Sequence, residues 1–474
     1  MADRMQLTAF RDRTRPTALA ALTTLAAAMA QLGCGESPPS HVGADAGVDA
    51  DVDAGPPEGC VDIIVDATAL DDPSRWYRDP REMPRHPFWV DERGVHVAWL
   101  ASIDDGPVID GPYFLVVSSF DRATGETVKS RVYDVYPADL PWAGIWDAAG
   151  SPDGSFAVVI GHADDSVVDG YVQLVVLGDL DHDEPRAVPL SPWNILDAEI
   201  FHVGFDGEAF AVHAVRGSSV WLVRLGADGT EVTPPTEVGS IASIWEDSAA
   251  FHTDAETGRT WMATGLSGGL WLSGHERDGT LLEGTEANGG VLITAQGQPP
   301  TGEAGGVPGL ATKGTEAVLA WQSFFNPGGD TRVQRAHGST PIGDALLMVD
   351  PPTATDKVMT WWQDAWWMGT LRPSTGIDQY RIDTASDGTL TSFARSPLVT
   401  FSECSPTCTG TQHDLLFVST FAAVRFEDEL WFGFRDSTAA FTRDEHPVSR
   451  DPYRIVRVAD RCTYHTMHEL DEPR

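Results

Sequence analysis

Positive charge is scarce in this 474-residue chain, and lysine is almost missing from it. Three Lys and 29 Arg stand against 70 Asp and Glu residues, so the formal net charge is −38. A field of that sign repels phosphate backbones and anionic lipid headgroups, and we therefore exclude nucleic acid as a partner. The same field suits cationic ligands or divalent cations and keeps the protein soluble.

Two other kinds of pattern are lacking. Runs of Leu, Glu, Lys and Ala that would form helices are few, whereas the chain holds 46 Gly, 32 Pro and 16 Trp. No nucleophile elbow, Walker loop, dinucleotide-binding fingerprint or zinc-protease helix occurs. The composition favours an all-β protein, and the missing signatures favour a protein that is not an enzyme, although they leave that question open.

The first 59 residues are typical of a leader rather than of a fold. Four Arg within the first fifteen positions precede residues 17–32, an apolar segment too short and too weakly hydrophobic for an ordinary membrane span. The sequence Leu32-Gly33-Cys34 follows. It resembles the end of a bacterial lipoprotein signal, in which a small residue precedes the lipidated Cys, except that Gln31 stands where a large aliphatic residue is usual.

Two outcomes follow from this leader, and both take the chain out of the cytosol. The resemblance implies a signal peptide over residues 1–33, a lipid anchor on Cys34, and a place at the bacterial outer membrane or cell surface. Cleavage after Ala30 would instead give a soluble secreted or periplasmic protein. In either case residues 34–59, rich in Asp, Ala, Gly and Pro, predict a disordered linker ahead of a domain over 60–474.

Cysteine is sparse, and four of the five copies fit disulfides. With the lipidated Cys set aside, an even number remains in an exported chain, which favours two bridges. Cys404 and Cys408 are close enough for a local bridge, and Cys60 would then pair with Cys462. The alternatives are a zinc site at Cys404, Cys408 and His413, and a crossed pairing of Cys60 with Cys404 or Cys408.

A pattern of two consecutive hairpins recurs seven times after Cys60. Each unit begins with a short apolar strand, a tight turn and a stronger apolar strand with aromatic residues, and a second hairpin follows. Gly and Asp suit such turns because tight hairpins need a positive φ or a side chain that bonds its own backbone. The first turns lie at Gly94, Gly154, Gly207, Gly258, Gly314, Asp364 and Asp428. The second turns lie at Gly125, His182, Gly229, Gly279, Gly338, Gly388 and Asp460.

Seven units of about four strands resemble a seven-bladed β-propeller. No known blade signature repeats, so the resemblance is one of architecture. The chain likewise resembles exported lipoproteins with propeller-like domains. Neither resemblance implies a specific activity. A single four-stranded sheet cannot bury both faces, but stacking on its neighbours around an axis buries them. Two packed β-sandwich domains are the alternative fold, against which the even spacing argues. We expect the following side chains between blades: Trp99, Trp321, Trp366, Trp367 and Trp431.

Closing such a ring requires the two ends of the domain to meet. Residues 61–66 are strand-like and precede the first unit, and residues 461–466 follow the last hairpin. We expect these two segments to lie in the same blade, with the bridge between Cys60 and Cys462 across that seam.

Histidines are the best candidates for a site. His202 and His252 occupy equivalent places in first strands, which line the central channel of a propeller, and His96 lies in a second strand. Imidazoles there could bind a metal ion or a ligand anion, or could be ordinary polar lining. Asp104–Asp105 and Asp164–Asp165 follow the second strands of adjacent blades, where their loops could hold a divalent cation.

The leading hypothesis is a non-catalytic module that binds protein or glycan at the cell envelope and is held to the membrane by its lipid. The alternatives are an exported hydrolase or lyase with a metal-dependent site in the channel, and a structural envelope protein. We expect no resident cofactor. Trp142, Trp146 and Trp361 are candidates for stacking on a ligand.

Overall fold

The structure is a computed structural model that describes most of the chain between residues 59 and 465. The described residues are 59–65, 70, 76–78, 87–103, 113–136, 143–163, 171–182, 184–190, 200–216, 219–240, 249–266, 269–282, 291–292, 304–323, 331–338, 340–348, 357–372, 376–400, 422–435, 453–459 and 462–465. They belong to the second of the two units into which the chain divides, Gly55–Arg474. No helix occurs among them, and so none that could cross a membrane.

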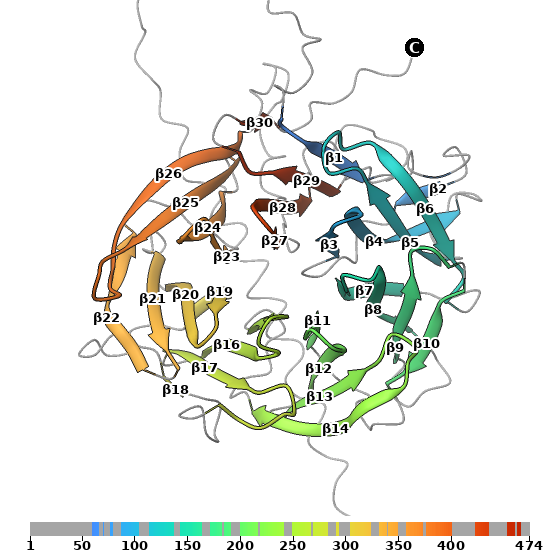
Figure 1. The fold of residues 1–474 in the computed structure, drawn as a ribbon, viewed down its shortest axis with the longest axis horizontal. Coiled ribbons are helices and arrows are strands. Elements are labelled where there is room, and N and C mark those ends of the chain that lie inside the picture. Colours follow the sequence, from blue (N-terminus) through green and yellow to red (C-terminus); the bar gives the residue numbers. More distant parts are fainter. Residues whose placement is uncertain are drawn as a thin grey trace, which may run out of the picture. The chain divides into compact units, whose positions relative to one another are not determined.

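Seven β-sheets stand around a central axis (Figure 1), and we number them as blades 1 to 7 in the chain order of their inner strands. The inner strands are β3 (Phe88–Asp91), β7 (Ala143–Gly150), β11 (Ile200–Phe205), β15 (Ala249–Thr253), β19 (Ala304–Lys313), β23 (Lys357–Trp362) and β27 (Ala422–Phe426). The second strands are β4 (Gly94–Ile103), β8 (Ser155–Ala163), β12 (Phe210–Arg216), β16 (Thr260–Leu266), β20 (Glu316–Ser323), β24 (Ala365–Arg372) and β28 (Glu429–Arg435).

Two further strands complete each blade toward the outside of the ring. The third strands are β5 (Tyr113–Phe120), β9 (Tyr171–Asp179), β13 (Ser219–Leu225), β17 (Gly269–His275), β21 (Thr331–His337), β25 (Gly376–Thr384) and β29 (Tyr453–Arg457). The fourth strands are β6 (Thr127–Tyr133), β10 (Arg186–Pro189), β14 (Glu231–Ser240), β18 (Val291–Leu292), β22 (Thr340–Met348), β26 (Leu390–Thr400) and, in blade 7, β1 (Asp62–Val65). The predicted all-β fold of seven four-stranded blades is confirmed.

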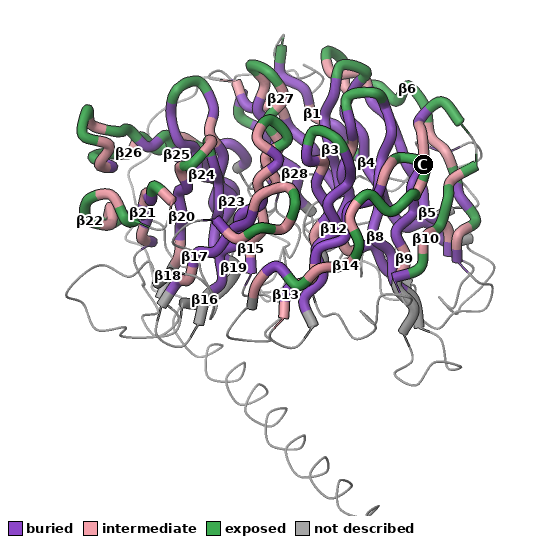
Figure 2. The backbone as a smooth tube through the Cα atoms, turned by 60° about the horizontal axis from the view of Figure 1, so that its bottom comes forward, coloured by how far each residue is buried: buried purple, intermediate pink, exposed green. Residues whose placement is uncertain are grey.

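The hairpin turns follow from the local sequence. Three outer turns share the motif Asp-Gly-Thr, and in the turn of blade 3 the carboxylate of Asp228 accepts the amide hydrogen of Thr230 at 2.9 Å. Gly229 between them has a φ of 75°, which a glycine adopts without strain. Since neighbouring strands run in opposite directions, the turns within both hairpins of a blade lie at one face of the ring. Figure 2 shows these exposed turns gathered on one side of the buried strands, and we call this side the turn face.

The core is divided among the seams between blades. Seven clusters of buried apolar side chains occur in the described residues, and each cluster joins two neighbouring blades. Burying both faces of every sheet is the main stabilisation that a ring of this kind provides. The predicted place of the five tryptophans between blades is confirmed. Four are buried: Trp99, Trp366, Trp367 and Trp431. Trp321 is partly buried and packs against the cluster between blades 4 and 5.

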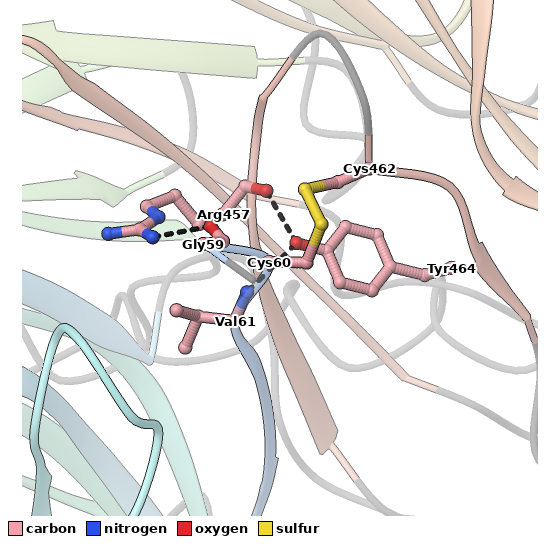
Figure 3. Close-up of a disulfide and its surroundings, with 6 residues drawn as sticks. All are labelled: Gly59, Cys60, Val61, Arg457, Cys462 and Tyr464. Carbon is pink, nitrogen blue, oxygen red and sulfur yellow. Dashed lines mark hydrogen bonds between the residues drawn. A yellow bond between two sulfur atoms is a disulfide. The ribbon is translucent and has the colours of Figure 1, made fainter. Parts of the chain in front are cut away.

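The ring closes inside blade 7, where an early strand joins late ones. β1 pairs antiparallel with β29, so that Asp62 lies opposite Val456. A disulfide joins Cys60 to Cys462, whose Cα atoms lie 5.6 Å apart (Figure 3). This is the bridge between the two ends of the domain that the cysteine spacing predicts.

The expectation that both end segments share one blade is wrong. After β29 the chain turns at Ala459, where its carbonyl accepts the amide hydrogen of Cys462, and then forms β30 (Tyr464–His465). β30 pairs in parallel with β26 of blade 6 rather than adding a strand to blade 7. The physical reason is that β1 already occupies the outer edge of β29, while the outer edge of β26 is free to accept a strand. One further short strand, β2 (Trp76–Arg78), pairs with β4.

Candidate functional site

A chain of hydrogen bonds crosses the inner strands of three successive blades. Asp147 on β7 places its Oδ2 atom 2.8 Å from Nδ1 of His202 on β11. Nε2 of His202 lies 3.1 Å from Oγ1 of Thr253 on β15. Asp147 is 2% exposed and also accepts the amide hydrogens of Ala148 and Val203. We call Asp147, His202 and Thr253 the relay.

Two local features of the backbone position the relay. The register between β7 and β8 shifts between Ile145 and Asp147, and such a bulge re-aims the side chain that follows it. Gly204 lets Thr253 lie directly against β11, because a Cβ atom at Gly204 would come within 2.5 Å of Cβ of Thr253. Any larger residue at position 204 would push the hydroxyl away from the imidazole.

The proton positions in the relay follow from its partners. A carboxylate only accepts hydrogen bonds, so His202 donates from Nδ1. When the imidazole is neutral, the lone pair on its Nε2 accepts the hydroxyl hydrogen of Thr253. The hydroxyl of Thr260 lies 3.0 Å from that of Thr253 and can donate to it. Carboxylate, imidazole and hydroxyl in this order are the arrangement of a nucleophilic triad. They also tie blades 2, 3 and 4 together, and His202 is only 12% exposed.

The other predicted histidines are engaged as well. Nδ1 of His252 lies 2.8 Å from Oγ1 of Thr312 on β19, so this inner-strand residue links blades 4 and 5. His96 is 1% exposed inside blade 1, where it lies 2.8 Å from both Asp91 and Ser119. Burial alone would raise the pKa of Asp91, but the hydrogen bond and charge of His96 outweigh this and lower it. His96 is therefore an internal residue of a blade rather than a channel residue.

A buried pair of histidines lies at the next seam. Nε2 of His213 on β12 lies 2.8 Å from Nε2 of His275 on β17. His213 was recognisable in the sequence as a second-strand residue, but nothing in the sequence singled out His275 or paired the two. The pairing depends on how blades 3 and 4 face one another, which no local pattern encodes.

A group of cationic and aromatic side chains lies near the turn face on blades 5, 6 and 7. Nζ of Lys313, the last residue of β19, lies 3.9 Å from the centre of the Trp361 ring on β23. Nη1 of Arg425 on β27 donates to the carbonyl oxygen of Trp361 at 3.2 Å. Both cations are exposed, and neither forms an ion pair with a carboxylate of the described residues. We call Lys313, Trp361 and Arg425 the cation–Trp cluster.

Strained turns flank this cluster. Among the described residues, the non-glycine residues with a positive φ are Gln363 at 47°, Asp364 at 57° and Glu427 at 50°. The first two form the turn that follows Trp361, and Glu427 lies in the turn that follows Arg425. Left-handed backbone at such residues costs free energy and is concentrated at functional sites. Trp361 was a candidate from the sequence, whereas its two cations were not, although one of only three lysines was a usable signal.

Several predicted residues lie outside the described part of the chain. They are Cys34, Asp104–Asp105, Trp142, Asp164–Asp165, Cys404, Cys408 and His413. Within the described segments, no group of three or more His, Cys, Asp and Glu side chains is arranged to hold a metal ion. The lipid anchor, the second bridge and the loop cation site therefore stay predictions.

Comparison with known proteins finds only distant likenesses to solved structures. No family model and no curated protein matches it. The polysaccharide lyase Uly1 is similar at 10% identity and a TM-score of 0.46, over 79% of this chain and 90% of that one. The β-propeller domain of the Trilobed protease from Pyrococcus furiosus is 8% identical with a TM-score of 0.38, over 79% and 91%. The phage phi92 endosialidase is 8% identical with a TM-score of 0.39, over 82% and 68%. Likenesses this distant carry no information about activity or ligand.

Proposed function

We propose that this protein is a non-catalytic binding module for a carboxylate-bearing glycan, displayed outside the cytoplasm. The cation–Trp cluster is the observation that carries the proposal. Lys313 and Arg425 are exposed cations without carboxylate partners in the described residues, in a chain that has 70 acidic side chains to offer. Lysine and arginine bind carboxylates through charge-assisted hydrogen bonds, which are stronger than neutral ones. These bonds act at contact distance, whereas salt screens the repulsion between a short acidic sugar and the net charge of −38 beyond about 8–10 Å.

The size and composition of the cluster favour a glycan over a protein partner. Its three side chains come from three adjacent inner strands, a span that suits one or two sugar rings. A stable protein interface buries about 1,200 Å² or more, which this cluster alone would not supply. Trp361 is partly exposed, and an indole can pack its ring on an apolar surface while its N–H stays in contact with water.

The envelope location is the second half of the proposal. The Arg-rich leader and Leu32-Gly33-Cys34 support export and lipidation, and the disulfide between Cys60 and Cys462 fits an oxidising compartment. Cys34→Ser should release the protein from membranes or block its maturation. An unmodified mature chain that begins at Gln31, seen by mass spectrometry, would refute the anchor.

Calorimetric titration of the purified domain tests the ligand class. We expect binding of an oligogalacturonate and none of a neutral maltooligosaccharide of equal length. Lys313→Gln and Arg425→Gln should each weaken binding by about tenfold, because each removes a charged hydrogen bond worth about 1.5 kcal/mol or more. Lys129→Gln is the matched control, since Lys129 is an exposed lysine on the outer strand β6. Equal losses in all three variants, or equal affinity for the neutral sugar, would contradict the proposal.

A hydrolase is the second candidate, and the relay is the observation that favours it. In this reaction Oγ1 of Thr253 would attack the acyl carbon of an ester while its proton passes to Nε2 of His202. The imidazolium would then protonate the leaving alcohol, and water would hydrolyse the acyl-threonine. A fluorophosphonate probe should label Thr253 in this case. Thr253→Val should abolish the labelling, whereas Thr312→Val, which removes the hydroxyl beside His252, should not; a probe that leaves Thr253 unlabelled removes this candidate.

A further inference from the structure

The seam between blades 3 and 4 has the smallest apolar core of the ring. Its cluster holds seven buried residues in the described part of the chain, and none of them is aromatic. The other six clusters hold between nine and sixteen, each with at least one buried Trp, Phe or Tyr. Because burial of apolar area is the main force that joins blades, this seam depends more than the others on its polar contacts.

Polar contacts cross this seam from its interior to the turn face. His213 and His275 meet in its interior, 1% and 5% exposed. His202 bonds to Thr253 at the inner strands. At the turn face, Arg277 of blade 4 donates to the carbonyl oxygen of Asp206 in blade 3 at 2.8 Å.

The partners of the histidine pair fix which nitrogen carries the proton in each neutral ring. Nδ1 of His275 lies 2.7 Å from the carbonyl oxygen of Glu276, which can only accept, so Nδ1 carries the proton. Nε2 of His275 is then a bare acceptor, and Nε2 of His213 must donate to it. Nδ1 of His213 is left unprotonated, buried and without a hydrogen-bond partner in the described residues.

Charged groups surround the two rings but do not bond to them. They lie on the inner and third strands of blade 3 and in the turns on both sides of the seam: His202, Asp206, Glu208, Arg224, Arg259, Glu276, Arg277 and Asp278. Most of these carboxylates are paired with arginines, as Asp206 is with Arg224 at 2.6 Å. No carboxylate hydrogen-bonds to either imidazole of the pair within the described segments.

Both rings resist protonation. Burial, and then the charges of His275 and His202, hold the pKa of His213 well below its usual value. Burial also lowers the pKa of His275, and the carbonyl of Glu276 and nearby carboxylates oppose this without reversing it. The pair therefore stays neutral at neutral pH.

We infer that the seam between blades 3 and 4 is an acid-sensitive joint, at which the ring loosens when the His213–His275 pair takes up a third proton. On Nδ1 of His213 that proton leaves the hydrogen bond in place but puts an N–H and a cation in the seam without an acceptor, and on Nε2 of His275 it sets N–H against N–H across 2.8 Å; either way a buried charge is left in the seam. The disulfide holds the closure at blade 7, so loosening begins at the weakest of the other seams. Because the bond from His202 to Thr253 crosses the same joint, the relay comes apart with it.

Hydrogen exchange on the intact protein tests the joint. Amides of β12 and β17 are compared at about pH 7.5 and about pH 5, with intrinsic exchange rates corrected, and β20 and β25 serve as internal references. We expect protection in β12 and β17 to fall at least tenfold more than in the references. Equal changes in all four strands, or none, would overturn the inference.

Two further measurements separate the joint from other acid effects. In the double variant His213→Gln with His275→Gln, amides offer donors and acceptors that do not titrate, so the excess loss of protection should vanish. His182→Gln, an exposed histidine at a turn, should leave it unchanged. If the double variant does not fold, long-range nitrogen-15 spectra of the wild-type protein decide: a ring of either residue that is protonated near pH 7.5, or a proton on Nε2 of His275, refutes the inference.

Discussion

The amide of Val61 donates a hydrogen bond to the hydroxyl of Tyr464, which lies 403 positions later in the chain (Figure 3). The same hydroxyl donates to the carbonyl oxygen of Arg457 at 2.7 Å, and burial raises the pKa of Tyr464, so it stays a donor across the ordinary pH range. Beside it runs the disulfide between Cys60 and Cys462. The start and the end of the propeller are thus joined by strand pairing, a buried hydroxyl and a covalent bond.

The covalent part of this closure should contribute strongly to stability. The bridge spans 402 positions, and the chain-entropy model puts its effect at about 6 kcal/mol, with measured effects often smaller. We expect the double variant Cys60→Ser with Cys462→Ser to lose several kcal/mol of unfolding free energy in urea. Wild-type protein under reducing conditions is the control and should behave alike; unchanged stability in both would show that strand pairing alone closes the ring.

Global stability should fall on the acid side of neutrality. The folded pKa values of His213 and His275 lie below the unfolded value near 6.5, so the unfolded state binds more protons below that pH. Their contribution is fully present above about pH 6.5 and is lost as pH falls, at about 1.4 kcal/mol per pH unit for each neutral ring. Urea midpoints between about pH 8 and about pH 5 measure the slope, and a slope unchanged by replacing both histidines with Gln would contradict this assignment.

Much of the fold could be predicted because hairpin chemistry is local. Gly and Asp favour tight turns through their own backbone and side-chain chemistry, so residues such as Gly207 and Asp364 revealed the repeat and the blade count. The prediction for the end of the chain was wrong in one respect. Ala459 does form a turn, but the strand after it, β30, pairs with β26 of blade 6 rather than within blade 7. Which edge is free depends on β1, hundreds of positions away.

The site was predictable only in part for the same reason. The sequence placed His202 and His252 on inner strands correctly, since strand order within a unit is local. Their partners Asp147 and Thr312 belong to other blades, so neither the relay nor the seam contacts could be derived from spacing. The neutral His213–His275 pair likewise exists only once two sheets have packed.

A buried ion pair at the turn face should be sensitive to loss of one partner. Asp206 is 1% exposed and accepts from Nε of Arg224 at 2.6 Å. Asp206→Asn leaves the buried guanidinium with only the exposed Glu208 as a countercharge, a change that costs about 3 kcal/mol. Glu208→Gln is the matched control, because Glu208 touches the same Arg224 but is largely exposed, and about 1 kcal/mol or less is expected. Urea unfolding that ranks the two variants equally would mean that Arg224 is not effectively buried.

The last prediction concerns the strained turn beside the cation–Trp cluster. A substitution there should raise the unfolding free energy and weaken ligand binding. Gln363 has a φ of 47°, and a side chain there costs about 1 kcal/mol that glycine does not. Gln363→Gly should therefore raise the unfolding free energy by about that amount. Thr315→Gly, in the equivalent turn of blade 5, is the control and should give no gain, because Thr315 has no positive φ and Gly314 already takes the left-handed place at 60°.

The same variant tests whether the strain serves the cluster. The turn at Gln363 begins two positions after Trp361, beyond Trp362, so a more flexible turn loosens the ring on which Lys313 lies. If the turn holds Trp361 in place for a ligand, Gln363→Gly binds oligogalacturonate several-fold more weakly while being more stable. A variant that is more stable and binds as the wild type would show that the strain has no part in recognition. A less stable variant would show that Gln363 makes contacts worth more than its backbone costs.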